Sequence, residues 1–356
     1  MRQAQLLKVE GLKQYFPIYG GFLGAQVNNV KAVDDISFVV NRGEAVSIVG
    51  ESGCGKSTTG RAILRLDEPT AGSIELDGVD LLSLNRGEMK DTRKEIQIIF
   101  QDPYASLNPR LTVRQILYES MNIQKHIKRK DREARMYELL DLVGLQRDQA
   151  ERFPHEFSGG QRQRIGIARA LSVDPKLIVC DEAVSALDVS IQAQVLNLLK
   201  KLQREMGLTY LFISHDLGVV RHISNRIIVM YLGKIVEIGD NDSIFENPKH
   251  PYTQALLSAI PVPNPKKKSK RILLKGDVPS PIDPPQGCRF HTRCPFATDL
   301  CKEETPQLRT VDKMAEGHQA ACHYINEVSF DNLKIEQELV KVESLQSEDA
   351  SYERVK

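Results

Sequence analysis

The chain has 356 residues, a length that allows two domains at the usual size of about 100–200 residues each. Its 48 lysines and arginines nearly balance its 47 aspartates and glutamates, which argues against a generally basic nucleic-acid binder and against an acidic disordered chain. Hydrophobic residues make up 41% of the sequence, but no apolar run approaches the roughly 20 residues needed to span a bilayer. Because no apolar signal segment opens the chain, we expect a protein that stays in the cytoplasm or docks on a membrane from that side.

The pattern of apolar residues predicts strands that alternate with helices along the first 240 residues. Strands are predicted at residues 6–10, 31–49, 74–76, 96–100, 177–180, 209–213, 226–232 and 234–238. Helices are predicted at residues 57–66, 111–125, 131–144, 160–171 and 190–205. The fold class is therefore mixed α/β, with an inserted helical stretch from about residue 102 to 172.

The turn after the strand that ends at Val49 fits the pattern G-x-x-x-x-G-K-[ST], and a helix-like run follows it directly. Glycines in such a turn let backbone N–H groups point inward around phosphate oxygens. Lys56 would reach the β- and γ-phosphates, Ser57 would ligate Mg²⁺, and the positive end of the following helix adds to the attraction. We predict a nucleotide phosphate site formed by Gly50, Glu51, Ser52, Gly53, Cys54, Gly55, Lys56, Ser57 and Thr58.

The apolar strand predicted at 177–180 ends in two carboxylates, Asp181 and Glu182. One carboxylate can hold the Mg²⁺ shell, and the next can polarise a water molecule. The surface end of an ordinary core strand gives the same pattern. Together with the glycine-rich turn, however, it predicts hydrolysis of a nucleotide.

A Ser-Gly-Gly-Gln sequence opens the helix predicted at 160–171. Here the chain resembles the ATP-binding-cassette (ABC) ATPases, whose signature is LSGGQ, with Phe157 in place of the usual leucine. Ser158 is expected to cap a helix whose first turn contains two glycines, which gives a second anion site. In this family the signature clamps the γ-phosphate of ATP bound to the partner subunit. The implied ligands are Ser158, Gly159, Gly160 and Gln161.

The other motifs of the ABC family follow in order over residues 6–240. Gln101 matches the Q-loop glutamine, which contacts Mg²⁺ and moves with the helical subdomain. Asp188 matches the D-loop. His215, directly after the strand predicted at 209–213, matches the switch histidine. The resemblance implies the ABC fold: a RecA-like phosphate-loop core, an antiparallel β subdomain and an inserted helical subdomain.

The resemblance also assigns roles to the site residues. Glu182 is expected to position and polarise the attacking water, with His215 on the γ-phosphate and Gln101 as the third catalytic residue. The Mg²⁺ ligands would be Ser57, Gln101 and Asp181. Each site is completed by a second ATPase subunit, because two cassettes close head to tail.

An aromatic residue that stacks on adenine is expected near Tyr15 and Phe16. Spacing from Leu12 favours Phe16, with Tyr15 as the second choice and a plain core aromatic as the alternative.

A closer resemblance links the chain to the ATPases of bacterial oligopeptide and dipeptide importers. It is carried by residues 185–240 and 250–257, while residues 16–24 and 181–185 look like the F-type subunit. The resemblance implies ATP-driven peptide import, two transmembrane permease subunits, an external peptide-binding lipoprotein and a place on the cytoplasmic face of the cell membrane. No nucleic-acid partner is expected. Residues 104–111 are the expected permease-docking surface.

The sequence leaves three alternative functions, two of which are disfavoured. The first alternative is the ATPase of a related importer for nickel or other metal complexes, or for another small solute. A soluble ABC protein that acts on ribosomes or DNA is disfavoured, because the chain has one cassette, no long heptad tract and a near-zero charge. A non-hydrolysing regulatory cassette is disfavoured because Glu182 and His215 are both present.

The composition changes near residue 261, where prolines and lysines predict a linker over 261–286. We expect the cassette over 1–260, a cysteine-rich region over 287–328 and a charged tail over 329–356 that is either a frayed helix or disordered. Within the linker, the basic run from Lys266 to Arg271 is either a solvated spacer or a contact for anionic lipid headgroups.

Four of the six cysteines crowd into the last quarter of the chain, and in the cytoplasm such a group is more consistent with metal binding than with disulfides. Their spacing lacks the short pairs usual in zinc ribbons. It resembles the cysteine-rich tail of the peptide-importer ATPases, which can bind a 4Fe-4S cluster. The implied ligands are Cys288, Cys294, Cys301 and Cys322, with zinc, or no metal, as alternatives.

Overall fold

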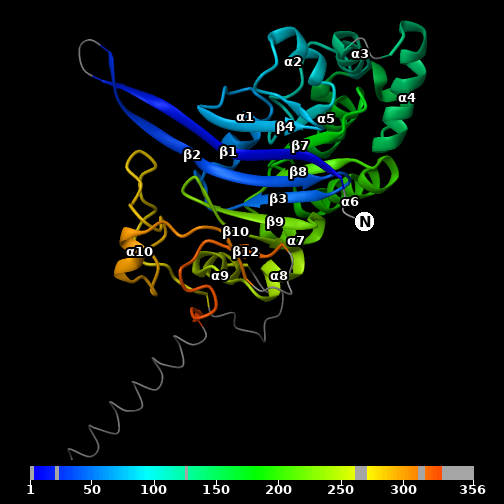
Figure 1. Cartoon of the computed structure of the whole chain (residues 1–356). Coiled ribbons are helices and arrows are strands. Elements are labelled where there is room, and N and C mark those ends of the chain that lie inside the picture. Colours follow the sequence, from blue (N-terminus) through cyan, green and yellow to red (C-terminus); the bar gives the residue numbers. More distant parts are fainter. Residues whose placement is uncertain (1–3, 21–23, 125–126, 261–270, 312–316, 331–356) are drawn as a thin grey trace, which may run out of the picture. The chain divides into compact units, whose positions relative to one another are not determined.

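The computed structural model describes residues 4–20, 24–124, 127–260, 271–311 and 317–330 (Figure 1). Lys266 to Lys270 of the basic run, and the charged tail from residue 331 onward, lie outside these ranges. Contacts divide the chain into two compact units: unit 1 is Met1–Ile235 with Ser280–Pro284, and unit 2 is the remainder. The division follows residue 235, whereas the sequence analysis ends the cassette at residue 260. Within the described ranges, no helix has the length and apolar character needed to cross a membrane.

Unit 1 contains two sheets and most of the helices. Its strands are β1 (Gln5–Gly20), β2 (Ala25–Asn41), β3 (Ala45–Val49), β4 (Ala71–Leu76), β5 (Val79–Asp80), β6 (Ile96–Ile99), β7 (Leu177–Asp181), β8 (Thr209–Ile213) and β9 (Arg226–Tyr231). Its α-helices are α1 (Lys56–Ile63), α2 (Arg86–Thr92), α3 (Val113–Gln124), α4 (Arg132–Val143), α5 (Gly159–Leu171), α6 (Val189–Met206) and α7 (Leu217–Ile223).

A parallel sheet in the order β9-β3-β8-β7-β6 forms the centre of unit 1 (Figure 1). Every residue of β3 and β8 is buried, which explains their continuous apolar sequences, because helices and loops cover both faces of a parallel sheet. The sequence analysis placed each of these strands to within a residue or two, except that it ran β2 and β3 together as 31–49. Arg42 to Glu44 separate the two strands.

The antiparallel sheet has the order β2-β1-β4-β5, and its first two strands form a long hairpin that reaches beyond the rest of unit 1 (Figure 1). The pairing continues from Leu7 opposite Val40 out to Gly20 opposite Ala25. The sequence analysis missed the outer half of this hairpin. Register shifts, Pro17 and several exposed polar residues interrupt the alternation by which a strand is normally recognised.

Between β6 and β7 the chain forms the predicted helical subdomain. It contains α3, α4 and α5 and the 3₁₀ turns η1 (Arg129–Asp131), η2 (Arg147–Glu151) and η3 (Pro154–Glu156). The helices pack through fully buried side chains that include Leu117, Met121, Leu139, Leu140 and Leu171. This small core packs α5 against the other helices of the subdomain and so holds the start of α5 in place.

Unit 2 contains short elements linked by irregular chain. They are α8 (Asn241–Glu246), α9 (Pro251–Ser258), α10 (Asp299–Glu303), β11 (Arg309–Thr310), β12 (Gln319–Ala320) and the greater part of β10 (Lys234–Asp240). Glu237 in β10 is fully buried and accepts hydrogen bonds from the backbone of Lys249 and His250 and from Nε2 of His318. This carboxylate therefore connects β10, the start of α9 and the segment before β12.

Candidate functional site

The glycine-rich turn lies between β3 and α1, as predicted, and its backbone needs glycine at two close approaches. Gly55 has a φ of +103°, and a Cβ placed there would lie 2.1 Å from the carbonyl oxygen of Ala32. At Gly50, with a φ of +153°, a Cβ would lie 2.2 Å from the carbonyl oxygen of Met230. The turn is also held by a hydrogen bond from the backbone N–H of Gly233 to the carbonyl of Cys54. A side chain at either glycine would displace the loop from its neighbours.

Lys56 is almost buried, and its ammonium closes the glycine-rich turn from inside. Nζ donates to the carbonyl oxygens of Gly50 at 2.9 Å and Glu51 at 3.0 Å and lies 3.9 Å from Sγ of Cys54. These carbonyl oxygens accept the hydrogen bonds that phosphate oxygens are expected to accept from Lys56. The ammonium is therefore already held in the concave side of the loop, where an anion binds.

Ser57 and Asp181 come together as the sequence predicts for a Mg²⁺ site. The Ser57 hydroxyl donates to Oδ1 of Asp181 at 2.8 Å, which connects α1 to the end of β7. Burial raises the pKa of Asp181, and the hydrogen bond from Ser57 opposes that shift. Gln101, the third predicted ligand, instead faces the neighbouring carboxylate.

Glu182 contacts both of the other predicted catalytic residues, Gln101 and His215. Its carboxylate accepts a hydrogen bond from Nε2 of Gln101 at 2.8 Å and lies 3.0 Å from Nδ1 of His215. Glu182 has a positive φ of 47°, uncommon for a residue with a side chain, and its backbone N–H is held by the carbonyl of Ile213. The carboxylate is thus fixed where β7 and β8 end, beside a small pocket that Glu182, Ser185 and His215 help to line.

Ser185 also belongs to this cluster, and the sequence analysis did not list it among the site residues. Its hydroxyl donates to the carbonyl of Glu182 at 3.0 Å and lies 3.4 Å from Nε2 of Gln101. Its position three residues after Glu182, in a tight turn, was the available signal. Asp188, predicted from the D-loop, is exposed at the N-cap position of α6, where its side chain makes no capping hydrogen bond.

The signature sequence starts α5. Ser158 is the N-cap, as predicted: its hydroxyl accepts from the N–H of Gln161, whose side chain accepts from the N–H of Ser158. Gly160 packs against α6 so closely that a Cβ would lie 2.3 Å from Cγ2 of Ile191. Ser158 itself is exposed, and Gly159 is half-buried. The first turn of α5 is therefore open to a ligand from outside this chain.

The two candidate aromatics differ in their contacts. The hydroxyl of Tyr15 donates to the carboxylate of Asp34, so this side chain is engaged within unit 1. The side chain of Phe16 is 38% exposed, and its residue pairs with Val30 on β2. Val30 precedes Ala32, whose carbonyl touches the glycine-rich turn, by only two residues. The free ring of Phe16 is thus the one available to a base.

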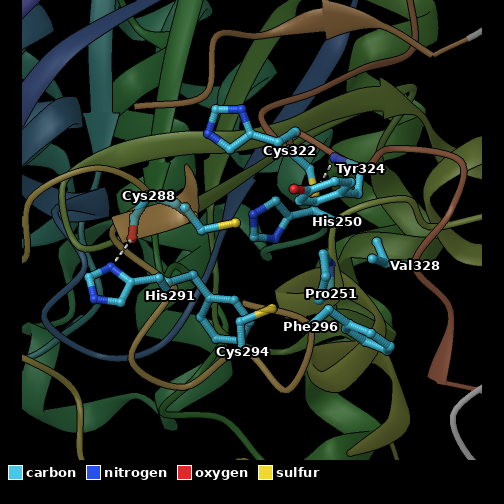
Figure 2. A pocket seen from close by; sticks show the side chains of 12 residues that line it. His250, Pro251, Cys288, His291, Cys294, Phe296, Cys322, Tyr324 and Val328 are labelled. Carbon is cyan, nitrogen blue, oxygen red and sulfur yellow. Dashed lines mark hydrogen bonds between the residues drawn. The ribbon is translucent and has the colours of Figure 1, made fainter. Parts of the chain in front are cut away.

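In unit 2 the four clustered cysteines line one small pocket, together with His250, His291 and His323 (Figure 2). All four are free thiols. Burial raises the pKa of Cys288 to about 11 and that of Cys294 to about 12, and the neighbouring thiols add to both shifts. Within the described part of the chain, however, no three His, Cys, Asp or Glu side chains are grouped so that they could hold a metal ion. The structure therefore gives no support to the iron–sulfur or zinc prediction.

Two family models match the chain. The one described as ABC transporter covers residues 33–185, and the one described as oligopeptide/dipeptide transporter, C-terminal region, covers residues 236–301. The oligopeptide transport ATP-binding protein AppF of Bacillus subtilis is 54% identical over 324 residues, which are 90% of this chain and 98% of that protein. The chain belongs to the ATP-binding subunits of the oligopeptide/dipeptide ABC transporter family.

Other members and solved cassettes agree with this assignment. The probable peptide ABC transporter ATP-binding protein y4tS of Sinorhizobium fredii is 51% identical over 318 residues, 89% of each chain. A dimeric structure of the ATP-binding cassette MJ0796 in a post-hydrolysis state, bound to ADP and Pi, is 30% identical with a TM-score of 0.58 and covers 66% of this chain and 99% of that one. The ABC ATPase fold implied by the sequence is confirmed.

The two aromatics of this peptide-transporter ATPase can be separated by substitution. We expect Phe16→Ala to weaken ATP binding about 5- to 100-fold, the effect of losing one base–aromatic stack. Tyr15→Phe, which keeps the ring and removes only the hydroxyl, is expected to leave the affinity within about twofold. Titration of each purified variant with a fluorescent ATP analogue measures both. Unchanged ATP affinity in Phe16→Ala would remove the stacking role from Phe16.

Proposed function

We propose that this chain is one of two ATPase subunits that drive peptide import across the bacterial cytoplasmic membrane, working from the cytoplasmic face. Membership of the peptide-transporter family supports the substrate class. The contacts of Glu182 with Gln101 and His215, beside the Ser57–Asp181 pair, support hydrolysis by this chain itself. A cassette that only regulates would have no use for a fully assembled set of this kind.

The phosphate loop supplies most of the electrostatic stabilisation. On binding ATP, Lys56 exchanges the carbonyls of Gly50 and Glu51 for the β- and γ-phosphate oxygens, and the loop amides surround the same oxygens. Ser57 and Asp181 are the residues that would hold Mg²⁺, which neutralises charge on the phosphates. The hydroxyl and the carboxylate already lie 2.8 Å apart, so this half of the site is preorganised.

Glu182 orients the attacking water. Hydrolysis needs a water in line with the bond to be broken, and a carboxylate at this position accepts a hydrogen bond from it. Gln101 and His215 hold the two carboxylate oxygens from opposite sides, which fixes the direction in which Glu182 can accept. His215 is exposed at its outer side, which leaves it able to contact the γ-phosphate.

The signature of this chain serves the ATP of the partner subunit. The start of α5 is accessible at Ser158 and Gly159, and it lies at the positive end of a 13-residue helix whose first turn contains no lysine. Asp188 is also exposed, and its proposed contact is the partner ATPase subunit. Closure of the two subunits would act on two permease subunits through residues 104–111, and an external lipoprotein would deliver the peptide.

Glu182→Gln is expected to lower ATP turnover by at least about a hundredfold, because the amide cannot accept the proton of the attacking water. ATP affinity should be retained, since the phosphate loop is unchanged, and the variant should accumulate as a closed dimer with the partner ATPase. Steady-state phosphate release by the assembled complex, with size-exclusion chromatography in ATP, measures both effects. Near-wild-type turnover would reject this role for Glu182.

The two anion sites can be tested separately. Lys56→Ala should abolish nucleotide binding by this chain, because Lys56 carries the only ammonium inside the loop among the described residues. Ser158→Arg should leave that binding intact and block closure over the partner's ATP. Equilibrium binding to the isolated chain and turnover of the complex distinguish the two variants. If Ser158→Arg abolishes ATP binding by this chain itself, the arrangement in trans is incorrect.

We further propose that Cys288, Cys294, Cys301 and Cys322 hold a metal centre in unit 2. The proposal is supported by the chemistry of the side chains, because four free thiols line one pocket of this unit. Four thiolates suit a 4Fe-4S cluster, with zinc as the alternative. Bound there, the centre would act as a cross-link in a unit whose helices and strands are short.

Protein purified without oxygen is expected to be brown, with broad absorption near ~400 nm and about four irons per chain. Serine at any one of the four positions should lose or destabilise the centre, whereas serine at Cys54 or Cys180 should not. ATP binding should survive in all four variants, because the phosphate loop lies in unit 1. Stoichiometric zinc without iron would replace the cluster by a zinc site, and absence of both metals would remove the proposal.

A further inference from the structure

An aromatic ring covers a buried arginine directly behind the signature turn. Arg162, in the first turn of α5, is only 7% exposed, and it donates from Nε to the carbonyl of Pro154 at 2.6 Å and from Nη2 to that of His155 at 3.3 Å. Its Nη1 is buried without a hydrogen-bond partner among the described residues. The centroid of the Tyr104 ring lies 3.7 Å from the guanidinium carbon. The face of an aromatic ring compensates a buried cation that lacks its full set of acceptors.

Tyr104 is not a core residue, because it is 65% exposed. Its position is fixed by its backbone instead: its N–H donates to Oδ1 of Asp102 at 2.7 Å, and the N–H of Ser106 donates to the carbonyl of Asp102. This turn begins directly after Gln101, which is bonded to Glu182. The ring that covers Arg162 is therefore three residues away from the glutamine of the catalytic cluster.

The segment after Gln101 is attached to α5 at two points. Arg169 lies seven residues after Arg162, and hence on the same face of the helix, and it donates to the backbone carbonyl of Ser106. That contact uses main chain and does not depend on the side chain at 106. The contact at Arg162 depends on the aromatic ring of Tyr104.

We propose that Tyr104 is a positioning residue for ATP hydrolysis: through Arg162 it fixes the signature turn relative to the Q-loop of the same chain. Arg162 carries the effect because its side chain also holds Pro154 and His155, the residues that lead into Phe157 and Ser158. Without the ring, the guanidinium becomes free to turn toward solvent, and the approach to the signature is held less firmly. The inference rests on the proposed function in one respect, namely that the signature serves the partner's ATP.

The test compares Tyr104→Ala, Tyr104→Leu and Tyr104→Phe in the assembled complex with the partner ATPase and the permease subunits. Alanine and leucine are expected to lower kcat about fivefold to thirtyfold, the range of one desolvated cation–π contact. The ATP affinity of this chain should not change. Phenylalanine keeps the ring and should keep kcat within about twofold of wild type. Tyr19→Ala is the matched control, because Tyr19 is also 65% exposed and lies on the β1–β2 hairpin.

The proposal would be overturned if kcat of Tyr104→Ala stayed within about twofold of wild type, which is the error of the comparison. It would also be overturned if Tyr104→Phe did not restore kcat. Loss of the permeases from the purified Tyr104→Ala complex would overturn it too, because the ring would then serve docking. Ser158→Arg, assayed in parallel, tests the arrangement in trans by itself. A complex inactivated by Ser158→Arg but unaffected by Tyr104→Ala would remove this inference alone. An active Ser158→Arg complex would remove the premise from the proposed function.

Discussion

The parallel order of β3, β8, β7 and β6 is the constraint on which the catalytic site depends. Parallel neighbours end at the same edge of a sheet, so the loops that follow these four strands meet there. They carry the phosphate loop, His215, the Asp181–Glu182 pair and Gln101, in that order across the sheet. Ser57 and Asp181, which are 124 positions apart in the sequence, thus come within hydrogen-bond distance at this edge.

At that edge, Glu182 connects the catalytic cluster to the helical subdomain. Its carboxylate is shared between Gln101, which begins the route to the helical subdomain, and His215. The same segment continues to Tyr104 and Ser106, which contact two arginines of α5. A continuous set of contacts therefore connects the carboxylate of Glu182 to the signature helix. Under the proposed function, the two ends of this set would act on different ATP molecules when two subunits close.

Unit 2 is organised on a different principle. It has few residues in regular elements, and the fully buried carboxylate of Glu237 takes over part of the role of a core by accepting three hydrogen bonds. A buried charge of this kind is tolerable only when it is fully hydrogen-bonded. The four cysteines converge on one pocket of the same unit. Burial raises the pKa of Cys288 and of Cys294, and the neighbouring thiols add to both shifts.

The sequence by itself determined the class of fold and the order of the motifs, and it predicted the phosphate loop and the catalytic carboxylate. These are local patterns: a glycine spacing, an apolar strand that ends in acids, and a serine before a helix. The outer half of the hairpin and the short elements α2, α7 and α8 were missed, because their stability comes from pairing and capping rather than from periodicity.

Only the tertiary structure showed that the Tyr15 hydroxyl bonds Asp34 while Phe16 is exposed, that Gln101 bonds Glu182, and that Tyr104 lies over Arg162. Each is a contact between residues from separate elements, and the distances involved are set by how the sheet and the helices pack. No spacing within one segment encodes such a distance, which is why the sequence identified the chemical groups while the fold determined their partners.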